Sequence, residues 1–153
     1  MARLEDLTEP CRSRVDNLPC PEFADQTWVA PKSMSERHVA VVSTAGLQRR
    51  GDHPFGVGGQ VYRVIPSKTP SADIIMCPVS TNFDRSGFQQ DGNVALPVDR
   101  LRELAEADTI GSVVDYHYSF MGATDPELMW THAERMIGLM KDDGVDTVLL
   151  IPI

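Results

Sequence analysis

The polar loop between residues 82 and 93 carries the densest set of side chains that could do chemistry. Asp84 and Asp91 supply carboxylates and Asn93 adds an amide, in a glycine-containing segment that follows an apolar run. Such groups can orient a small polar substrate or exchange protons with it when a scaffold holds them in place. We expect Asp84 to be catalytic and Asp91 and Asn93 to bind substrate. The alternative is a solvated connection in which the two aspartates only form turns.

His117 is the second candidate, because it lies between two tyrosines near the end of another apolar run. An imidazole can act as a general acid or base near neutral pH, so we expect a catalytic His117 that faces the same cleft as Asp84 and Asp91. Side chains alternate along a strand, which turns His117 away from Tyr116 and Tyr118. The alternative is an interior histidine held by hydrogen bonds.

The elements that must position these groups are strands that are mostly apolar. Ser43 and Thr44 follow the first of them, and ligands of parallel sheets bind beyond the carboxyl ends of the strands, so we expect both residues to contact substrate. We interpret the strand formed by residues 148–153 as a central one. The segments with strand character are residues 38–42, 61–65, 72–79, 113–120 and 146–153.

Two amphipathic stretches predict the helices that cover the sheet. Asp99 is the expected N-cap of the first, whose buried face comprises Leu101, Leu104 and Ala105. Thr124 and Glu127 form the expected capping box of the second, which ends at Gly144. The apolar stripe of this second helix comprises Met129, Ala133, Met136, Ile137 and Met140.

The order of these elements predicts an α/β fold. We expect three layers, a mainly parallel sheet with helices on both faces, incomplete at the C-terminus because no covering helix follows residues 148–153. Residues 1–36, which are rich in proline, predict an irregular N-terminal arm, and residues 37–153 predict the α/β domain. A chain of 153 residues is long enough for one such domain.

Charge and hydropathy exclude several classes of function. The 22 acidic residues outnumber the 14 basic ones, which gives a net charge of −8 and disfavours nucleic acids and anionic membranes as partners. The N-terminus lacks the apolar core of a signal peptide, and no run approaches the roughly 18 apolar residues of a membrane span. We therefore expect a cytoplasmic protein with its three cysteines as thiols.

Other chemistry-bearing residues fit no strong motif. His117 and His132 lack the spacing of metal ligands, so no metal is expected. The glycines of residues 56–59 precede a strand and not a helix, which removes the geometry of a phosphate-binding loop. Cys77 could be the nucleophile of a cysteine-based isomerase, although a buried cysteine acting as a small apolar residue is commoner.

Several ordered blocks of the sequence resemble the selenoprotein B family. This family includes the substrate-binding subunits of glycine, sarcosine and betaine reductases, a subunit of D-proline reductase, and shorter relatives. Pro78 departs from the family pattern, because many relatives carry a histidine there. The matching blocks include V-V-S-T-A-G-L at residues 41–47, S-T-N-F-D-R-S-G-F-Q-Q-D-G-N at residues 80–93, L-P-V-D-R-L-R-E-L at residues 96–104 and H-Y-S-F-M-G-A-T-D-P at residues 117–126.

The resemblance implies a selenol- or thiol-dependent reductase that acts on a small polar, amino-acid-like substrate. It implies a thiol reductant protein or a partner subunit, with a homo-oligomer as a further option. It also implies a selenocysteine or cysteine directly after Ile153 and no cofactor within the chain itself. We therefore expect a sequence truncated at a UGA codon and inactive without its redox centre. The alternative function is a non-catalytic α/β binding or scaffold protein.

Overall fold

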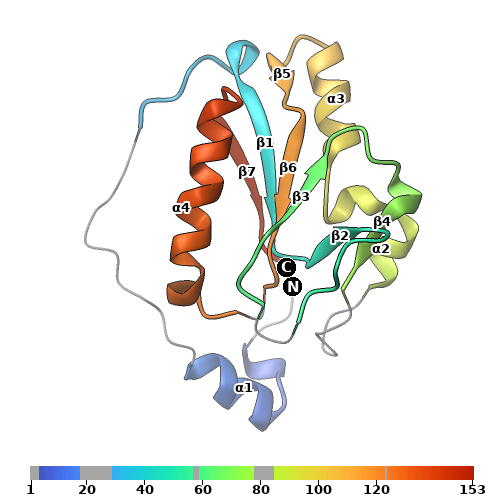
Figure 1. Cartoon of the computed structure of the whole chain (residues 1–153). Coiled ribbons are helices and arrows are strands. Elements are labelled where there is room, and N and C mark those ends of the chain that lie inside the picture. Colours follow the sequence, from blue (N-terminus) through green and yellow to red (C-terminus); the bar gives the residue numbers. More distant parts are fainter. Residues whose placement is uncertain (1–3, 18–28, 57–58, 78–84, 123) are drawn as a thin grey trace. The chain divides into compact units, whose positions relative to one another are not determined.

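The computed structural model describes residues 4–17, 29–56, 59–77, 85–122 and 124–153 (Figure 1). Asp84 and Pro78 lie outside these ranges. The chain divides into two compact units, Met1–Pro31 and Lys32–Ile153. The first unit contains a 3₁₀ turn, η1 (Leu4–Asp6), and one helix, α1 (Glu9–Asp16). All of the candidate residues that the structure describes belong to the second unit.

The second unit is a mixed α/β fold built on strand β1. β1 pairs in parallel with β7 along one edge and with β5 and then β6 along the other, and β3 runs antiparallel to β6. β2 and β4 form a separate antiparallel pair. The strands are β1 (His38–Ser43), β2 (Leu47–Arg49), β3 (Arg63–Pro66), β4 (Ile74–Met76), β5 (Ser112–Val113), β6 (Tyr116–Ser119) and β7 (Thr147–Ile151).

The α/β class predicted from the sequence is confirmed, but the sheet is less regular than expected. A parallel pair needs a long crossover connection, usually through a helix. The chain between β3 and β4 contains only the short 3₁₀ turn η3 (Ser71–Asp73), so β4 pairs with β2 and not with the main sheet. The remaining helical elements are η2 (Met34–Glu36), α2 (Ser86–Gln90), η4 (Gly92–Val94), α3 (Val98–Glu106) and α4 (Pro126–Asp142).

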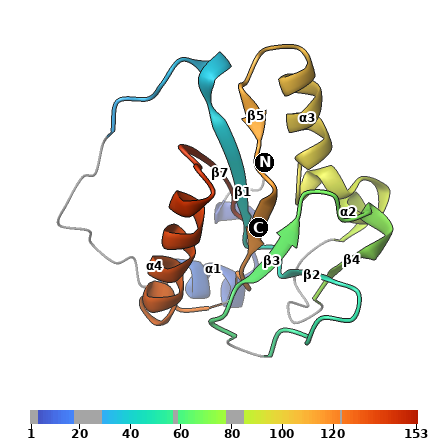
Figure 2. The same ribbon diagram turned by 45° about the horizontal axis from the view of Figure 1, so that its top comes forward.

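Alternate residues of β1 face two separate hydrophobic clusters. Val39 and Val41 pack in the cluster that contains Leu101 of α3. Ala40 and Val42 pack in the cluster that contains the α4 residues Met136 and Met140, with Met129 beside it. Figures 1 and 2 show α3 and α4 flanking the sheet. Within the described ranges, no helix has the length and apolar character that crossing a membrane requires.

Each predicted helix stripe is narrower than expected. Leu104 of α3 and Ile137 of α4 were assigned to the buried faces, but their side chains are exposed. Leu104 lies three positions after the buried Leu101, and Ile137 lies one position after the buried Met136. Both residues are therefore at the edge of the face that contacts the sheet. This edge of each helix is therefore exposed to solvent.

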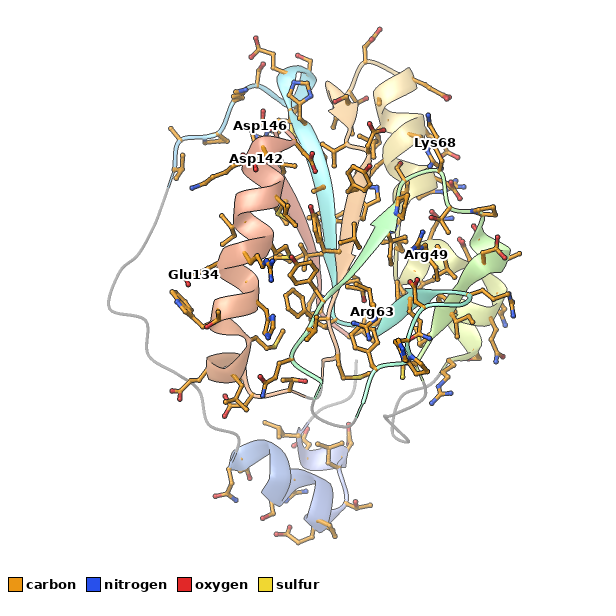
Figure 3. The ribbon with its side chains drawn as sticks, in the orientation of Figure 1. Arg49, Arg63, Lys68, Glu134, Asp142 and Asp146 are labelled. Carbon is orange, nitrogen blue, oxygen red and sulfur yellow. The ribbon has the colours of Figure 1, made fainter. Side chains whose placement is uncertain are left out.

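Strand β7 is less buried than a central strand should be. Among the described residues it pairs with β1 alone, and the side chain of Leu150 is 67% exposed. The start of β7 is tied to the start of β1 by Asp146, which accepts a hydrogen bond from the backbone N–H of His38 at 3.0 Å (Figure 3). Asp146 also pairs with Lys32 at 2.9 Å. The predicted strand is confirmed. Within the described residues, however, β7 has only one neighbouring strand and is not central.

The predicted N-caps of both long helices are wrong. Pro97, and not Asp99, occupies the N-cap of α3. The N-cap of α4 is Asp125, whose carboxylate accepts the backbone N–H of Glu127 at 3.0 Å. Thr124 instead donates to the backbone oxygen of Gly59. Proline is favoured at the first helical position, so Pro126 moves the cap of α4 to the residue directly before it.

Replacing Asp125 with alanine should therefore lower the free energy of unfolding by about 1 kcal/mol, because the N–H of Glu127 loses its acceptor. Asp125→Asn is the matched control, since the amide oxygen can still accept that hydrogen bond. Urea unfolding of the three proteins would measure the effect. Equal stability of the alanine and asparagine variants would contradict the assignment of the cap.

Helix α4 is stopped by Gly144, as predicted, and this glycine directly follows the C-cap residue Asp143. Its φ of 71° is in the left-handed region, its N–H donates to the oxygen of Lys141 at 3.1 Å, and the N–H of Val145 donates to the oxygen of Met140 at 2.9 Å. This pair of bonds is a Schellman motif. Val145 also packs against the cluster that contains Met140, which completes the motif.

Gly144→Ala should lower the free energy of unfolding by about 1 kcal/mol, because the left-handed conformation is unfavourable for alanine. Gly138→Ala is a control within the same helix, and it should stabilise the protein by about 0.5–1 kcal/mol. A Cβ at Gly138 meets nothing within 4 Å. Thermal unfolding followed by circular dichroism would show the opposite signs, and the same sign for both variants would contradict the motif.

Candidate functional site

The imidazole of His117 fills an irregularity in the sheet. Val39 pairs with Val113 and Val42 pairs with Tyr118, so β1 advances by three positions while the neighbouring chain advances by five. The partner strand is therefore interrupted between β5 and β6. At this gap the backbone N–H of Val41 donates to Nδ1 of His117 at 3.1 Å. A side chain thus takes the hydrogen bond that a regular ladder would give to a backbone oxygen.

His117 is completely buried and uncharged at neutral pH. Burial lowers the pKa of the imidazole to about 4, with a smaller contribution from the positive charge of Arg102. Since Nδ1 accepts the N–H of Val41, the single proton of the neutral ring lies on Nε2. Nε2 has no hydrogen-bond partner among the described residues.

A cavity lies against the ring of His117, between the sheet and the segment η4–α3. Its volume is about 30 Å³, and the wider depression around it measures about 430 Å³ with solvent-open space included. Polar groups of Ser67, Asn93, Asp99 and Arg102 line it together with His117. Its apolar wall includes Ile65, Ile74, Phe88, Leu96 and Val98. A mixed lining of this kind is typical of sites for small molecules.

A hydrogen-bonded network from α3 holds the polar side of this cavity. Arg102 pairs with Asp99 at 2.6 Å. The guanidinium of Arg102 also donates to the backbone oxygen of Ser67 and, at 3.2 Å, to its hydroxyl. These contacts connect α3 to the chain that follows β3. The side chain of Arg102 is therefore held in place by both segments.

Asn93 completes the network and caps α3. Its side-chain oxygen accepts the backbone N–H of Asp99 at 3.1 Å. Its amide nitrogen donates to Asp91 at 2.9 Å and to Asp99 at 3.3 Å. The backbone N–H and then the side chain of Asn93 lower the pKa of Asp91. The structure thus gives Asn93 a capping role in addition to its place at the cavity.

The predicted site residues divide into three groups. His117 and Asn93 line the same cavity, and Asp91 contacts it only through Asn93. Ser43 is buried at the end of β1, where its hydroxyl accepts the N–H of Ala45. Thr44 beside it donates to the oxygen of Ile153 at 3.1 Å and accepts its N–H at 2.8 Å. Asp84 lies outside the described residues.

Two charged residues of the cavity, Asp99 and Arg102, are not indicated by the sequence pattern. The pattern predicts only a capping role for Asp99 and no role for Arg102. Their spacing of three residues on a predicted helix was the available signal, because such pairs meet on a helix surface. Nothing local indicates that Arg102 also contacts Ser67, which lies 35 residues earlier.

Cys77 lies in a small apolar cluster with Phe55 and Met121, away from this cavity. Its thiol is buried and donates to the backbone oxygen of Phe55 at 3.6 Å. This environment is typical of a cysteine that packs as a small apolar residue. Across the part of the chain that the structure describes, no group of three or more His, Cys, Asp or Glu side chains could hold a metal ion.

The fold and the cavity together define an α/β domain with a buried polar pocket against its sheet. Residues 70–152 match the family described as glycine/sarcosine/betaine reductase selenoprotein B (GRDB). These residues include β4, α3, β6, α4, β7 and the imidazole of His117. The chain belongs to this family.

Three curated relatives are named as reductase components. The D-proline reductase subunit gamma of Acetoanaerobium sticklandii is 27% identical over 78% of this chain and 50% of the subunit. The betaine reductase complex component B subunit beta of Peptoclostridium acidaminophilum is 26% identical over 87% of this chain and 32% of the subunit. The glycine reductase complex component B subunit gamma of Carboxydothermus hydrogenoformans is 28% identical over the same shares.

The chain therefore spans about a third to a half of the length of these relatives. No solved structure matches it significantly.

Proposed function

We propose that the chain forms the substrate-binding part of a selenol- or thiol-dependent reductase, and that the His117 cavity binds a small, amino-acid-like substrate. The observation that carries this proposal is the buried imidazole of His117, which lines a mixed polar and apolar cavity and whose Nε2 has no partner among the described residues. Family membership supports the reductive chemistry, because the relatives are named as reductase components.

The charges around the cavity are complementary to a zwitterion. A substrate carboxylate can approach the guanidinium of Arg102 and the imidazole N–H, while an ammonium group approaches Asp99. The carbon skeleton can contact the apolar wall formed by residues such as Ile65 and Phe88. Asp99 and Arg102 balance each other, so the site favours a ligand with no net charge.

The proposed reaction needs a nucleophile that we do not assign to a described residue. A selenolate or thiolate displaces the leaving group from the substrate carbon. A second thiolate then attacks the bound selenium or sulfur, the released carbon takes up a proton, and the pair of chalcogens becomes oxidised. We propose that this nucleophile is a selenocysteine or cysteine outside residues 1–153 or in a partner subunit. Asp84 remains a proposed catalytic carboxylate.

Titration calorimetry of the full chain with glycine, sarcosine, betaine and D-proline tests the binding site. We expect at least one of them to bind. Arg102→Gln should weaken that binding about tenfold or more, because a charge-assisted contact is lost. Arg100→Gln is the matched control, since Arg100 lies on the same helix and pairs with Glu103 on an exposed surface.

The outcomes separate the two functions considered from the sequence. Dithiol-dependent consumption of the bound compound in the presence of the partner subunits supports a reductase. Binding without consumption under those conditions favours a non-catalytic binding protein. If none of the four compounds binds, or if the two arginine variants weaken binding equally, the proposed site is wrong.

A further inference from the structure

The two ring nitrogens of His117 have different tasks. Nδ1 accepts the backbone N–H of Val41 at 3.1 Å, in the gap between β5 and β6. This bond fixes the plane of the ring and requires that Nδ1 carry no proton. Nε2 is therefore a donor, it is buried, and no described residue accepts its hydrogen. An unsatisfied buried donor is costly, so Nε2–H needs an acceptor other than the described residues, and a ligand can supply it.

We propose that Nε2–H of His117 is a specificity-determining donor that binds an oxygen of the substrate, and that His117 does not exchange protons during the reaction. This inference rests on the proposed function, because it concerns the same cavity. It assigns one atom of the chain to one type of ligand group, an acceptor oxygen such as that of a carboxylate. An ammonium group at this position would face another donor and be rejected.

The surroundings of the ring support a fixed donor. The charged groups that line the cavity with His117 are Arg102 and Asp99, both from α3, and they pair with each other. The chain after β3 contributes hydroxyl groups, including that of Ser67, and η4 contributes the amide of Asn93. No described carboxylate is hydrogen-bonded to the ring. Burial and the nearby guanidinium both favour the uncharged ring, as its lowered pKa reflects.

The size of the cavity limits what can reach Nε2. About 30 Å³ is the space open to the centre of a water-sized group, so the cavity has room for at least one such group. One small group, such as a carboxylate oxygen, can therefore enter, while the rest of the ligand lies in the wider depression. A buried water is the simplest competitor for the same position, and the experiment has to distinguish it from a substrate.

Two variants separate the tasks of the two nitrogens. Asparagine places an oxygen near the position of Nδ1, so His117→Asn should keep the bond from Val41 and lose the donor. Glutamine places an N–H near the position of Nε2, so His117→Gln should keep the donor and lose the bond from Val41. At pH 7 we expect His117→Asn to bind D-proline about tenfold more weakly or worse while unfolding like the wild type. His117→Gln should bind within about threefold of the wild type and unfold more easily.

Nitrogen-15 spectra of the imidazole show whether a ligand contacts Nε2–H. A purely structural role of His117 would not change this signal when a ligand is added. Nε2–H should shift when D-proline is added and should not shift with pyrrolidine, which lacks the carboxylate. Affinity for D-proline should stay constant between pH 5.5 and 8. Sarcosine, betaine and glycine serve as replacement probes, with methylamine as the control for glycine.

If the wild type binds none of these probes, the proposed function fails and this inference fails with it. Equal binding by the wild type and His117→Asn overturns only this inference and leaves the cavity as the site. An Nε2–H signal that does not move when a probe binds also overturns it, and indicates that a buried water satisfies His117. Affinity that changes with a midpoint near pH 6.5 would restore an acid–base role.

Discussion

Lowering the pH from 7 to 4 should reduce the free energy of unfolding by about 3 kcal/mol through His117 alone. Burial and Arg102 lower the pKa of this imidazole from 6.5 to about 4 in the folded protein. The folded state therefore binds fewer protons than the unfolded state between these values. The stabilising contribution is complete above about pH 6.5 and is lost as the pH falls towards 4.

Urea unfolding at half-unit intervals between pH 4 and 8 would measure this dependence. His117→Asn should flatten the curve in that window, because its amide does not titrate. Asp91, whose pKa is lowered by the N–H of Asn93, titrates below 3.8 and outside the window. A wild-type curve as flat as that of the variant would show that the imidazole is not buried in the neutral form.

Gly122→Ala should destabilise the protein by about 1–3 kcal/mol, because the new methyl group has no space. A Cβ at this position would lie 2.7 Å from the backbone oxygen of Ile153 and 2.8 Å from that of Thr44. The oxygen of Ile153 cannot move freely, since the hydroxyl of Thr44 binds both the N–H and the oxygen of Ile153. The substitution therefore forces apart the ends of β1 and β7.

Gly56→Ala is the matched control, because a Cβ there meets nothing within 4 Å. Its unfolding free energy should lie within about 0.5 kcal/mol of the wild type. Chemical denaturation at pH 7 compares the two variants under conditions where His117 contributes fully. Equal stability would mean that the ends of β1 and β7 can separate without cost.

The elements that depend on local pattern were predictable from the sequence. The apolar run of residues 39–42 indicated β1, and the end of α4 at Gly144 followed from the conformational freedom of glycine. Alternation along β6 correctly placed His117 and Tyr118 on opposite faces. Periodicity also identified Met136 and Met140 as core residues, although it did not show where solvent covers the edge of the stripe.

The state of His117 depended on tertiary structure alone. Its Nδ1 binds Val41, which lies 76 residues earlier, and this contact exists only because β5 and β6 advance farther than β1 beside them. Arg102 likewise reaches Ser67 across 35 residues. A sequence pattern shows which residue types recur along one element, but it does not specify the register in which two strands pair. The family and the α/β class could therefore be predicted. The burial of His117 was one of two alternatives, and the partners of its two nitrogens were decided by how distant strands pair.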